Sequence, residues 1–356
     1  MRKTTWVAVA AGVLGLNGCS SNAMGDRRRV LQLPDNAPIP KMQLCVGAQH
    51  ACGIRPDGSV NCWRSNLPVT RSCEQYFNRD VPYVRDNSVP ECGQSEPPPG
   101  PFVELACGQV HTCGIRPNGR VECWGSNKIS QLDVPTDEPF SHIRSQGNET
   151  CGVTREGNVH CWGWHKFFSP EKWVVADIAP LGPDYAAWGG ADDFTGVCGL
   201  LQKNRERVCI SWTRGLRKSG ETGWLDAVDG LAIFEGTYRC GIRSDGTLKC
   251  ATKFWVPPPG HFKQLARYGH TPCALSDAGS VACFAKNDLI FPSTAPRFFL
   301  EHNMNWSFPL PGNDYTEIAA GIFGLCGRTR GDEFKCAYGI PQDRLADPTP
   351  QFEPTT

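Results

Sequence analysis

Cysteines recur along this chain in pairs with a fixed spacing, and that spacing limits what the chain can fold into. Six pairs are ten residues apart and a seventh, Cys198/Cys209, is eleven apart. Glycine follows the first cysteine in six of the seven copies. A unit that recurs in this way predicts an array of similar supersecondary elements and not a set of unrelated domains. The ten-residue pairs are Cys52/Cys62, Cys113/Cys123, Cys151/Cys161, Cys240/Cys250, Cys273/Cys283 and Cys326/Cys336.

The clearest copy, residues 102–127, has the pattern of a β-hairpin. At its centre is Pro117-Asn118-Gly119, in which proline fixes one turn dihedral and Asn-Gly supplies positive φ at little cost. Counting outward from this turn places Cys113 opposite Cys123 in a non-hydrogen-bonded pair, where Cα atoms lie about 4.5 Å apart. A disulfide accepts that separation, so each copy is predicted to carry one bridge across its hairpin.

The other cysteines lie outside the hairpin pattern. Cys73 and Cys92 share one long segment, residues 67–101, and are predicted to pair, whereas the pairing of Cys45 with Cys107 is left open. Structural zinc sites usually need two close cysteine pairs with two to four intervening residues, and the sequence has no such clustering. We therefore expect disulfides, and neither a metal nor a cofactor.

The N-terminus resembles a bacterial lipoprotein signal. The basic pair Arg2-Lys3 precedes the apolar segment Trp6 to Leu16, which is too short to cross a bilayer, and Cys19 follows closely. This resemblance implies a signal peptide over residues 1–18, lipidation of Cys19 and a polar tether over residues 19–29. Secretion without a lipid is the alternative.

Either route leads to an oxidising space, where the 18 cysteines other than Cys19 can persist as disulfides. We expect the bacterial cell envelope, with a lipid-anchored chain that faces the periplasm or the cell surface. The formal net charge is zero, from 36 basic and 36 acidic residues, so composition gives no electrostatic case for nucleic acid. The 38 glycines and 29 prolines predict many turns and few long helices.

Five short motifs in the second copy are Leu105-Ala106-Cys107-Gly108, His111-Thr112-Cys113-Gly114, Asn118-Gly119, Cys123-Trp124-Gly125 and Gln131-Leu132. They resemble the regulator of chromosome condensation repeat family, in the branch of the secreted bacterial β-lactamase-inhibitor propeller. This resemblance implies an all-β, seven-bladed β-propeller over residues 30–356, with one disulfide-stapled hairpin per blade. The copies run over about 41–66, 102–127, 140–165, 184–212, 231–254, 262–287 and 315–340.

Two short segments are expected to complete blades as outer strands. Gln131 to Val134 follows the second hairpin and is expected to serve its blade. Val30 to Leu33 has a similar composition but no preceding hairpin, so we expect it to pair with the blade of Cys326 and Cys336. Such pairing would close the ring and remove two open sheet edges.

Three histidines, His50, His111 and His270, hold the same position in their copies. They suggest ligands around an axis, but other residue types stand at that position elsewhere, which favours a structural role. The adjacent Asp192 and Asp193 would point to opposite faces of a strand. The sequence has no phosphate loop, zinc-protease motif or nucleophile elbow, so no catalytic residue is predicted.

Candidate partner-binding residues lie in two stretches. One is aromatic and continues beyond the third copy into a segment expected to be irregular, where rings can anchor a partner, stack on a sugar or simply pack. The other is a basic group in the fourth copy, which can engage an anionic polymer or form a solvated face. These candidates are Trp164, Phe167, Phe168, Trp173, Arg205 and Arg207.

We therefore expect an envelope module that binds a protein or a surface polymer through loops and meets the membrane only through its lipid. The alternative is an extracytoplasmic enzyme that acts on polysaccharides at the propeller axis. A cytoplasmic exchange-factor role, as in the founder of the family, is a third hypothesis. Convergent carboxylates or histidines near the axis would favour the enzyme, whereas a smooth axis with an aromatic loop patch would favour binding.

Overall fold

The computed structural model divides into two units, residues 1–31 and residues 32–356, and every described residue lies in the second unit. The structure describes residues 42–64, 72–77, 89–164, 166–169, 172–179, 196–211, 215–218, 224–229, 239–250, 259–268, 271–283, 310, 312–321, 324–338 and 353–354. Cys19, His270 and the segment Val30 to Leu33 lie outside these ranges, so the predictions about them stay predictions. No helix within the described ranges has the length and apolar character that a membrane crossing requires.

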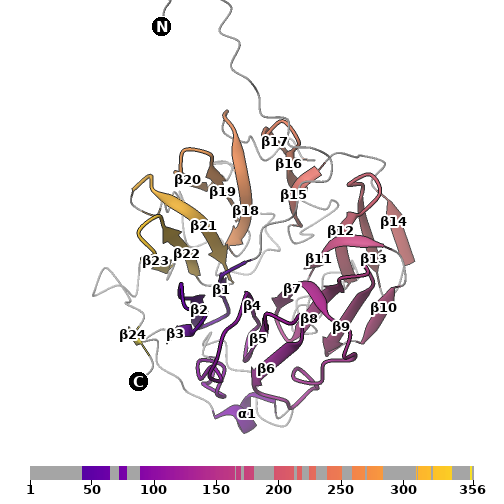
Figure 1. Cartoon of the computed structure of the whole chain (residues 1–356), viewed down its shortest axis with the longest axis vertical. Coiled ribbons are helices and arrows are strands. Elements are labelled where there is room, and N and C mark those ends of the chain that lie inside the picture. Colours follow the sequence, from indigo (N-terminus) through magenta and orange to yellow (C-terminus); the bar gives the residue numbers. More distant parts are fainter. Residues whose placement is uncertain are drawn as a thin grey trace, which may run out of the picture. The chain divides into compact units, whose positions relative to one another are not determined.

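The described strands form seven small antiparallel sheets, which we call A to G in chain order (Figure 1). Sheet A consists of β1 (Leu44–Val46), β2 (His50–Ile54), β3 (Val60–Arg64) and β24 (Glu353–Pro354). Sheet B consists of β4 (Glu104–Cys107), β5 (His111–Ile115) and β6 (Val121–Gly125). Sheet C consists of β7 (Phe140–Gln146), β8 (Glu149–Thr154), β9 (Val159–Gly163) and β10 (Phe167–Ser169). Sheet D consists of β11 (Trp173–Ala179), β12 (Gly196–Leu201), β13 (Arg207–Ser211) and β14 (Gly215–Lys218). Sheet E consists of β15 (Trp224–Asp229), β16 (Arg239–Arg243) and β17 (Leu248–Cys250), and sheet F of β18 (Phe262–Tyr268), β19 (Thr271–Ser276) and β20 (Val281–Cys283). Sheet G consists of β21 (Tyr315–Ala320), β22 (Gly324–Thr329) and β23 (Phe334–Tyr338).

Each sheet contacts the next one along the chain, mainly through its first strand. Strand β1 contacts β4, β4 contacts β7, β7 contacts β11, and the series continues from β12 to β15, β18 and β21. Strand β1 also contacts β21 and β22, so sheet A has sheet B on one side and sheet G on the other. We call the first strand of each sheet its inner strand.

The hairpin of sheet B has the register that the cysteine spacing predicts. Cys113 pairs with Cys123 across β5 and β6, their Cα atoms are 4.0 Å apart, and a disulfide joins them. Gly119 has a φ of 93°, a left-handed conformation that glycine adopts without strain. Equivalent bridges staple sheets A, E, F and G, and they are Cys52–Cys62, Cys240–Cys250, Cys273–Cys283 and Cys326–Cys336. In sheet D, Cys198 and Cys209 are register partners, but their side chains lie outside the described part of the structure.

The hairpin of sheet C has its predicted bridge, but the segment after it differs from the prediction. Cys151 and Cys161 are register partners across β8 and β9, and a disulfide joins them with Cα atoms 4.0 Å apart. The residues that follow were expected to be irregular, yet they form β10, in which Phe167 pairs with Cys161. Strand β9 is therefore an internal strand of a four-stranded sheet, and Cys161 is buried within it and does not lie at the sheet edge.

The glycine after the first cysteine has a packing explanation. An aromatic ring lies directly on the backbone of this glycine, so that a Cβ on Gly114 would sit 2.5 Å from the ring of Phe102. A Cβ on Gly152 would meet Phe140 at the same distance. Real Cβ atoms do not come that close, so any larger residue would displace the ring. The recurring glycine therefore marks where an aromatic side chain enters the core between sheets.

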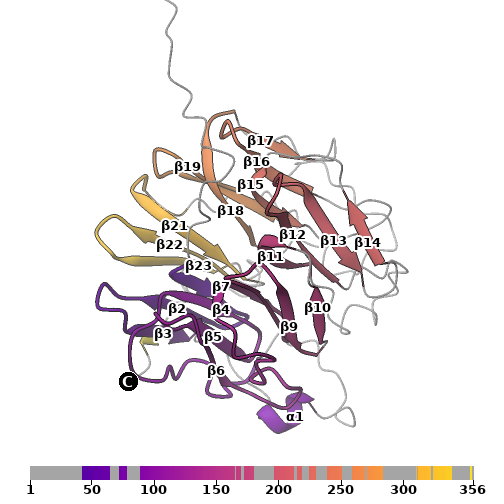
Figure 2. The same cartoon turned by 45° about the vertical axis from the view of Figure 1, so that its right-hand side comes forward.

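A disulfide-anchored segment lies between the first two sheets in the chain. Figure 2 shows its short helix α1 (Cys73–Phe77), which the sequence did not predict. The predicted Cys73–Cys92 disulfide joins this helix to the following segment. Gln94 is buried, and its backbone carbonyl accepts hydrogen bonds from Thr112 Oγ1 and Trp124 Nε1. The segment is thereby held against sheet B.

The structure corrects the prediction about the outer strand of sheet B. Residues 131–134 form no strand, and sheet B has three strands within the described residues. Gln131 is fully buried, and its Oε1 accepts a hydrogen bond from the backbone N–H of Ile129. This side-chain hydrogen bond, and not strand pairing, holds the segment in place. In sheet A the fourth strand is β24, in which Glu353 pairs with Arg64.

Candidate functional site

The inner strands share a pattern that places one polar residue at the same point in several sheets. An aromatic residue comes first, a polar residue follows two positions later, and an aliphatic residue comes next. The aromatic residue is buried in the core, and in β7, β18 and β21 the register shifts just after it. The polar residues are Glu104 in β4, His142 in β7, Gln264 in β18 and Glu317 in β21.

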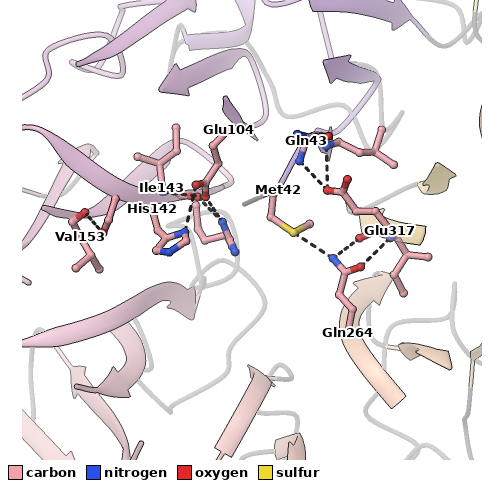
Figure 3. Close-up of polar contacts among 12 residues, drawn as sticks. Met42, Gln43, Glu104, His142, Ile143, Val153, Gln264 and Glu317 are labelled. Atoms are coloured by element: carbon pink, nitrogen blue, oxygen red, sulfur yellow. Dashed lines mark hydrogen bonds and ion pairs between the residues drawn. The ribbon is translucent and has the colours of Figure 1, made fainter. Parts of the chain in front are cut away.

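Three of these polar side chains bind the backbone of the next sheet (Figure 3). Glu317 Oε1 accepts the N–H groups of Gln43 and Leu44 at 2.8 and 3.0 Å. Gln264 contacts both backbone groups of Ile318, because Oε1 accepts the N–H at 2.9 Å and Nε2 donates to the carbonyl at 2.9 Å. We call this set of contacts the polar belt.

Glu104 makes the corresponding contact from sheet B to sheet C. Its carboxylate accepts the N–H of Ile143 at 3.2 Å and is fully buried. Arg144 donates to Glu104 Oε1 at 2.6 Å, and His142 Nδ1 lies 3.2 Å from Oε2 (Figure 3). A buried carboxylate is costly unless it is paired and hydrogen-bonded, and here the arginine supplies the countercharge.

Glu317 differs from Glu104 because its countercharges are more distant. Burial raises the pKa of Glu317 to about 7, although the N–H groups of Leu44 and Gln43 and the charges of Arg328 and Arg144 oppose that rise. Arg328 donates to Gln43 Oε1 and pairs with Asp332 at 2.7 Å. A carboxyl group with a pKa near 7 loses its proton as pH rises through neutrality, so we expect the stability of the junction of sheets G and A to depend on pH.

The belt is built chiefly to hold sheets together. Its two carboxylates accept backbone N–H groups of a neighbouring strand, which an acid–base catalyst would not need to do. Sequence reasoning missed these residues, although the recurring polar position after each aromatic residue was visible. The missing information was the partner, which lies 39 to 274 residues away along the chain.

The repeated histidines also bridge neighbouring sheets. His50 Nε2 lies 2.8 Å from Thr112 Oγ1, and His111 Nε2 lies 2.8 Å from Thr150 Oγ1. Because the Thr112 hydroxyl donates to the backbone carbonyl of Gln94, its oxygen accepts the proton of His50 Nε2. Burial lowers the pKa of both histidines to about 3.

One histidine lies among cysteine sulfurs in a way that resembles a metal site. A ring nitrogen of His50 and the sulfurs of Cys52 and Cys107 all lie within 4.8 Å of one another and are buried. Cys52 is bonded to Cys62, and Cys107 is bonded to Cys45. Sulfurs in disulfides are not thiolates, so in this state they offer a metal no ligand. The bridge between Cys45 and Cys107, which the sequence left open, joins sheets A and B.

The predicted partner-binding residues are not brought together as one surface. Trp173 takes the aromatic core position of sheet D and is 1% exposed, so it packs in the interior and is not available to a partner. Arg205 is also buried, in the hairpin turn of sheet D, with a φ of 53°. The side chain of Arg207 lies outside the described part. These findings correct the prediction for Trp173 and Arg205.

The aromatic residues before Trp173 lie near the outer edge of sheet C. Phe168 in β10 is 55% exposed, and its ring lies 4.8 Å from that of His160 in β9. Phe167 is half-buried against the core shared with sheet D, and Trp164 is half-buried just after β9. Phe168 is thus the candidate from this stretch that remains accessible.

Comparisons with known proteins agree with this architecture. Residues 102–128 match the model of the regulator of chromosome condensation (RCC1) repeat. A sequence search of curated proteins found no match. Among solved structures, the CRINKLY WD40 ectodomain of the Arabidopsis thaliana receptor kinase ACR4 is similar with a TM-score of 0.55 and 16% identity, over 87% of this chain and 98% of that one.

Two further solved structures were matched. The ectodomain of the Physcomitrella patens receptor kinase CR4 has a TM-score of 0.52 and 18% identity, over 83% of this chain and 72% of that one. Yeast RCC1 (Prp20), solved with Kap60, has a TM-score of 0.48 and 12% identity, over 94% of this chain and 86% of that one. The chain therefore carries an RCC1 repeat at residues 102–128, within an all-β fold similar to that of the two receptor ectodomains.

Proposed function

We propose that this chain is an extracytoplasmic interaction module, a closed seven-bladed β-propeller that binds a protein or an envelope polymer through one edge and its loops. Lipidation of Cys19 anchors it in the bacterial envelope. Its several disulfides are typical of proteins that leave the reducing cytoplasm. The RCC1 repeat at residues 102–128 supports a repeat propeller, a scaffold whose loops can carry a binding surface.

Contacts at sheet A support ring closure. Strand β1 contacts both β4 and β21, so the first sheet meets the second and the last described sheets. Glu317 of sheet G binds the backbone of sheet A in the same way that Gln264 of sheet F binds that of sheet G. Because the last junction repeats an internal one, seven blades closed on themselves account for the contacts.

The observation that carries the interaction proposal is the exposure of Phe168. A large aromatic side chain that is 55% exposed at a sheet edge is an anchor of the kind found at the centre of protein interfaces. Exposed Lys166 precedes it by two positions. An apolar anchor beside a cation fits an acidic protein segment or an anionic polymer.

The test compares two exposed positions on the full-length protein. Tagged wild type, Phe168→Ser and Lys128→Ser are used to capture material from detergent-solubilised envelope of the host, where Lys128 lies in the exposed loop after β6. We expect wild type and Lys128→Ser to retain the same partner and Phe168→Ser to lose at least about tenfold of it. Equal capture by all three would remove this site from the proposal.

A second candidate, an enzyme acting on envelope polysaccharides, is favoured by one observation. Burial raises the pKa of Glu317 to about 7, which suits a general acid, although the same carboxylate also accepts two backbone N–H groups of sheet A. Wild type, Glu317→Gln and Glu104→Gln would be incubated with solubilised peptidoglycan, and reducing ends measured. Turnover by wild type that Glu317→Gln abolishes while its circular dichroism spectrum stays that of wild type would support the enzyme, and no turnover by wild type would count against it.

A further inference from the structure

Two disulfides lie side by side at the junction of sheets A and B, and together they form a four-sulfur cluster. Cys45, Cys52 and Cys62 are direct register partners across β1, β2 and β3, and Cys107 comes from β4 of the next sheet. All four cysteines are buried in one hydrophobic cluster with Phe102, Leu105 and Trp124. Side chains that are opposite each other in adjacent antiparallel strands point to the same face, which explains why the sulfurs converge.

The two bridges in this cluster have different tasks. Cys52–Cys62 closes a hairpin within sheet A, and its partners are ten residues apart. Cys45–Cys107 spans 62 residues and is the bridge that links two sheets within the described structure. The sulfurs of Cys52 and Cys107, which belong to different bridges, lie within 4.8 Å of each other. A sulfur of the inter-sheet bridge therefore faces a second bond that a thiolate can attack.

We propose that this cluster is a thiol–disulfide exchange site, in which the link between sheets A and B moves from Cys45–Cys107 to Cys52–Cys107 when the inter-sheet bridge is reduced. The reductant is a dithiol, which gives two electrons and two protons to Cys45 and Cys107 and becomes a cyclic or protein disulfide. The Cys107 thiolate then attacks Cys52 Sγ, the Cys52–Cys62 bond breaks, and Cys62 leaves as a thiolate. The proton lost by Cys107 passes to Cys62, and this second step needs no further electrons.

A polar group lies beside Cys107, the attacking residue. The Thr112 hydroxyl lies 4.0 Å from Cys107 Sγ, so a thiolate there would compete with the backbone carbonyl of Gln94 for the single hydroxyl proton. Thr112 is itself fixed by His50 Nε2 at 2.8 Å and by the carbonyl of Gln94 at 3.0 Å. No comparable pair of neighbouring bridges involves Cys113–Cys123 within the described residues, where Cys113 Sγ contacts Thr150 Oγ1 at 3.7 Å. That hairpin bridge is an internal reference.

The consequence is a junction that survives one round of reduction. After exchange, sheets A and B remain joined through Cys52–Cys107, and the cysteines that carry thiols are Cys45 and Cys62. A single bridge would instead lose the link between sheets at once. The cluster thereby protects the inter-sheet link against one dithiol equivalent.

The experiment is limited reduction of the full-length folded protein with dithiothreitol, followed by acid quench, alkylation and peptide mapping. We expect the main singly reduced species to carry label on Cys45 and Cys62 and a peptide link between Cys52 and Cys107. The double variant Cys52→Ser with Cys62→Ser lacks the acceptor bond and should instead be labelled on Cys45 and Cys107. If that variant does not fold, the wild-type map decides alone.

Two outcomes would overturn the proposal. One is label on Cys45 and Cys107 of the wild type with Cys52–Cys62 intact, which would show reduction without exchange. The other is simultaneous labelling of this cluster and of the reference pair Cys113 and Cys123, which would show that the bridges open only when the whole chain unfolds. Recovery of the Cys52–Cys107 link while the reference pair stays unlabelled would establish the exchange.

Discussion

Sheet A has two neighbours, and the two junctions are held by different chemistry. Its junction with sheet B has the Cys45–Cys107 disulfide, the neutral pair of His50 and Thr112, and an apolar cluster. Its junction with sheet G has the carboxylate of Glu317 on two backbone N–H groups and an apolar cluster with Cys326. Both use hydrophobic burial, but the polar contacts respond to opposite conditions.

The comparison teaches that equivalent junctions in a repeat can be held by different chemistry. At the A–B junction the sensitive groups are a bond that reductants break and a histidine that acid protonates. At the G–A junction the sensitive group is a carboxyl group that base deprotonates. Lower pH should weaken the first junction and strengthen the second. The predictions below test that contrast.

The largest effect is expected from removing the inter-sheet disulfide. In the double variant Cys45→Ser with Cys107→Ser, the unfolded chain regains the entropy of a loop with a separation of 62 residues. The chain-entropy model gives a loss of about 4 kcal/mol in the free energy of unfolding. Chemical denaturation under non-reducing conditions measures it.

The matched control removes a hairpin bridge with the same two substitutions. Cys113→Ser with Cys123→Ser opens a loop with a separation of only ten residues, so about 3 kcal/mol is expected. A hairpin variant that loses clearly more stability than the inter-sheet variant would contradict the special role of the A–B bridge. Equal losses would show that the inter-sheet bridge contributes no more stability than a hairpin bridge.

A smaller effect is expected from His50 as the pH falls. Its pKa is about 3 in the folded protein and 6.5 in the unfolded chain, so the unfolded state binds more protons between these values. Stability from this group is present above 6.5 and is lost as pH falls toward 3, on the order of 2 kcal/mol by about pH 5. Chemical denaturation at a series of pH values should show that the free energy of unfolding of His50→Gln falls less steeply below pH 6.5 than that of the wild type.

His111 provides a graded check, because burial lowers its pKa to the same value. The double variant His50→Gln with His111→Gln should lose more of the acid sensitivity than the single variant, but less than twice as much, because His111 itself helps to lower the pKa of His50. If the free energy of unfolding falls with acid as steeply in both variants as in the wild type, carboxylates, and not these histidines, control stability in that range.

The hairpins could be predicted from sequence because their information is local. Proline and Asn-Gly fix the turn in residues 117–119, and counting outward from it gives the observed pairing of Cys113 with Cys123. The number of sheets in the described part equals the number of cysteine pairs for the same reason. The pairing of Cys45 with Cys107 could not be predicted from the sequence, because it depends on how sheets A and B pack against each other.

The site was predictable only in part, because its contacts cross between sheets. Glu104 and Glu317 look like ordinary surface carboxylates in the sequence, and only the neighbouring strand shows what they bind. The sequence makes Trp173 a candidate for a binding role because this residue lies in an aromatic stretch without a clear strand pattern. Its spacing to Val175 repeats that of Phe140 to His142, with the same register shift, and this could have placed it in the core.

The smallest effect is expected from Glu317→Gln. The pKa of Glu317 is about 7 in the folded protein and 4.5 in the unfolded chain, so the folded state binds more protons between these values. Its contribution to stability is present below 4.5 and is lost as pH rises through 7.

Between about pH 6 and pH 7.5 the wild type should lose on the order of 1 kcal/mol that Glu317→Gln retains. The reverse exchange, Gln264→Glu, supplies the matched test, because Gln264 binds Ile318 from the equivalent position of sheet F. An ionised carboxylate there would face the backbone carbonyl of Ile318. The free energy of unfolding of Gln264→Glu should therefore fall more steeply with rising pH than that of the wild type. If both variants titrate like wild type, the G–A junction is not controlled by a proton, and the contrast between the two neighbours of sheet A is one of disulfide chemistry alone.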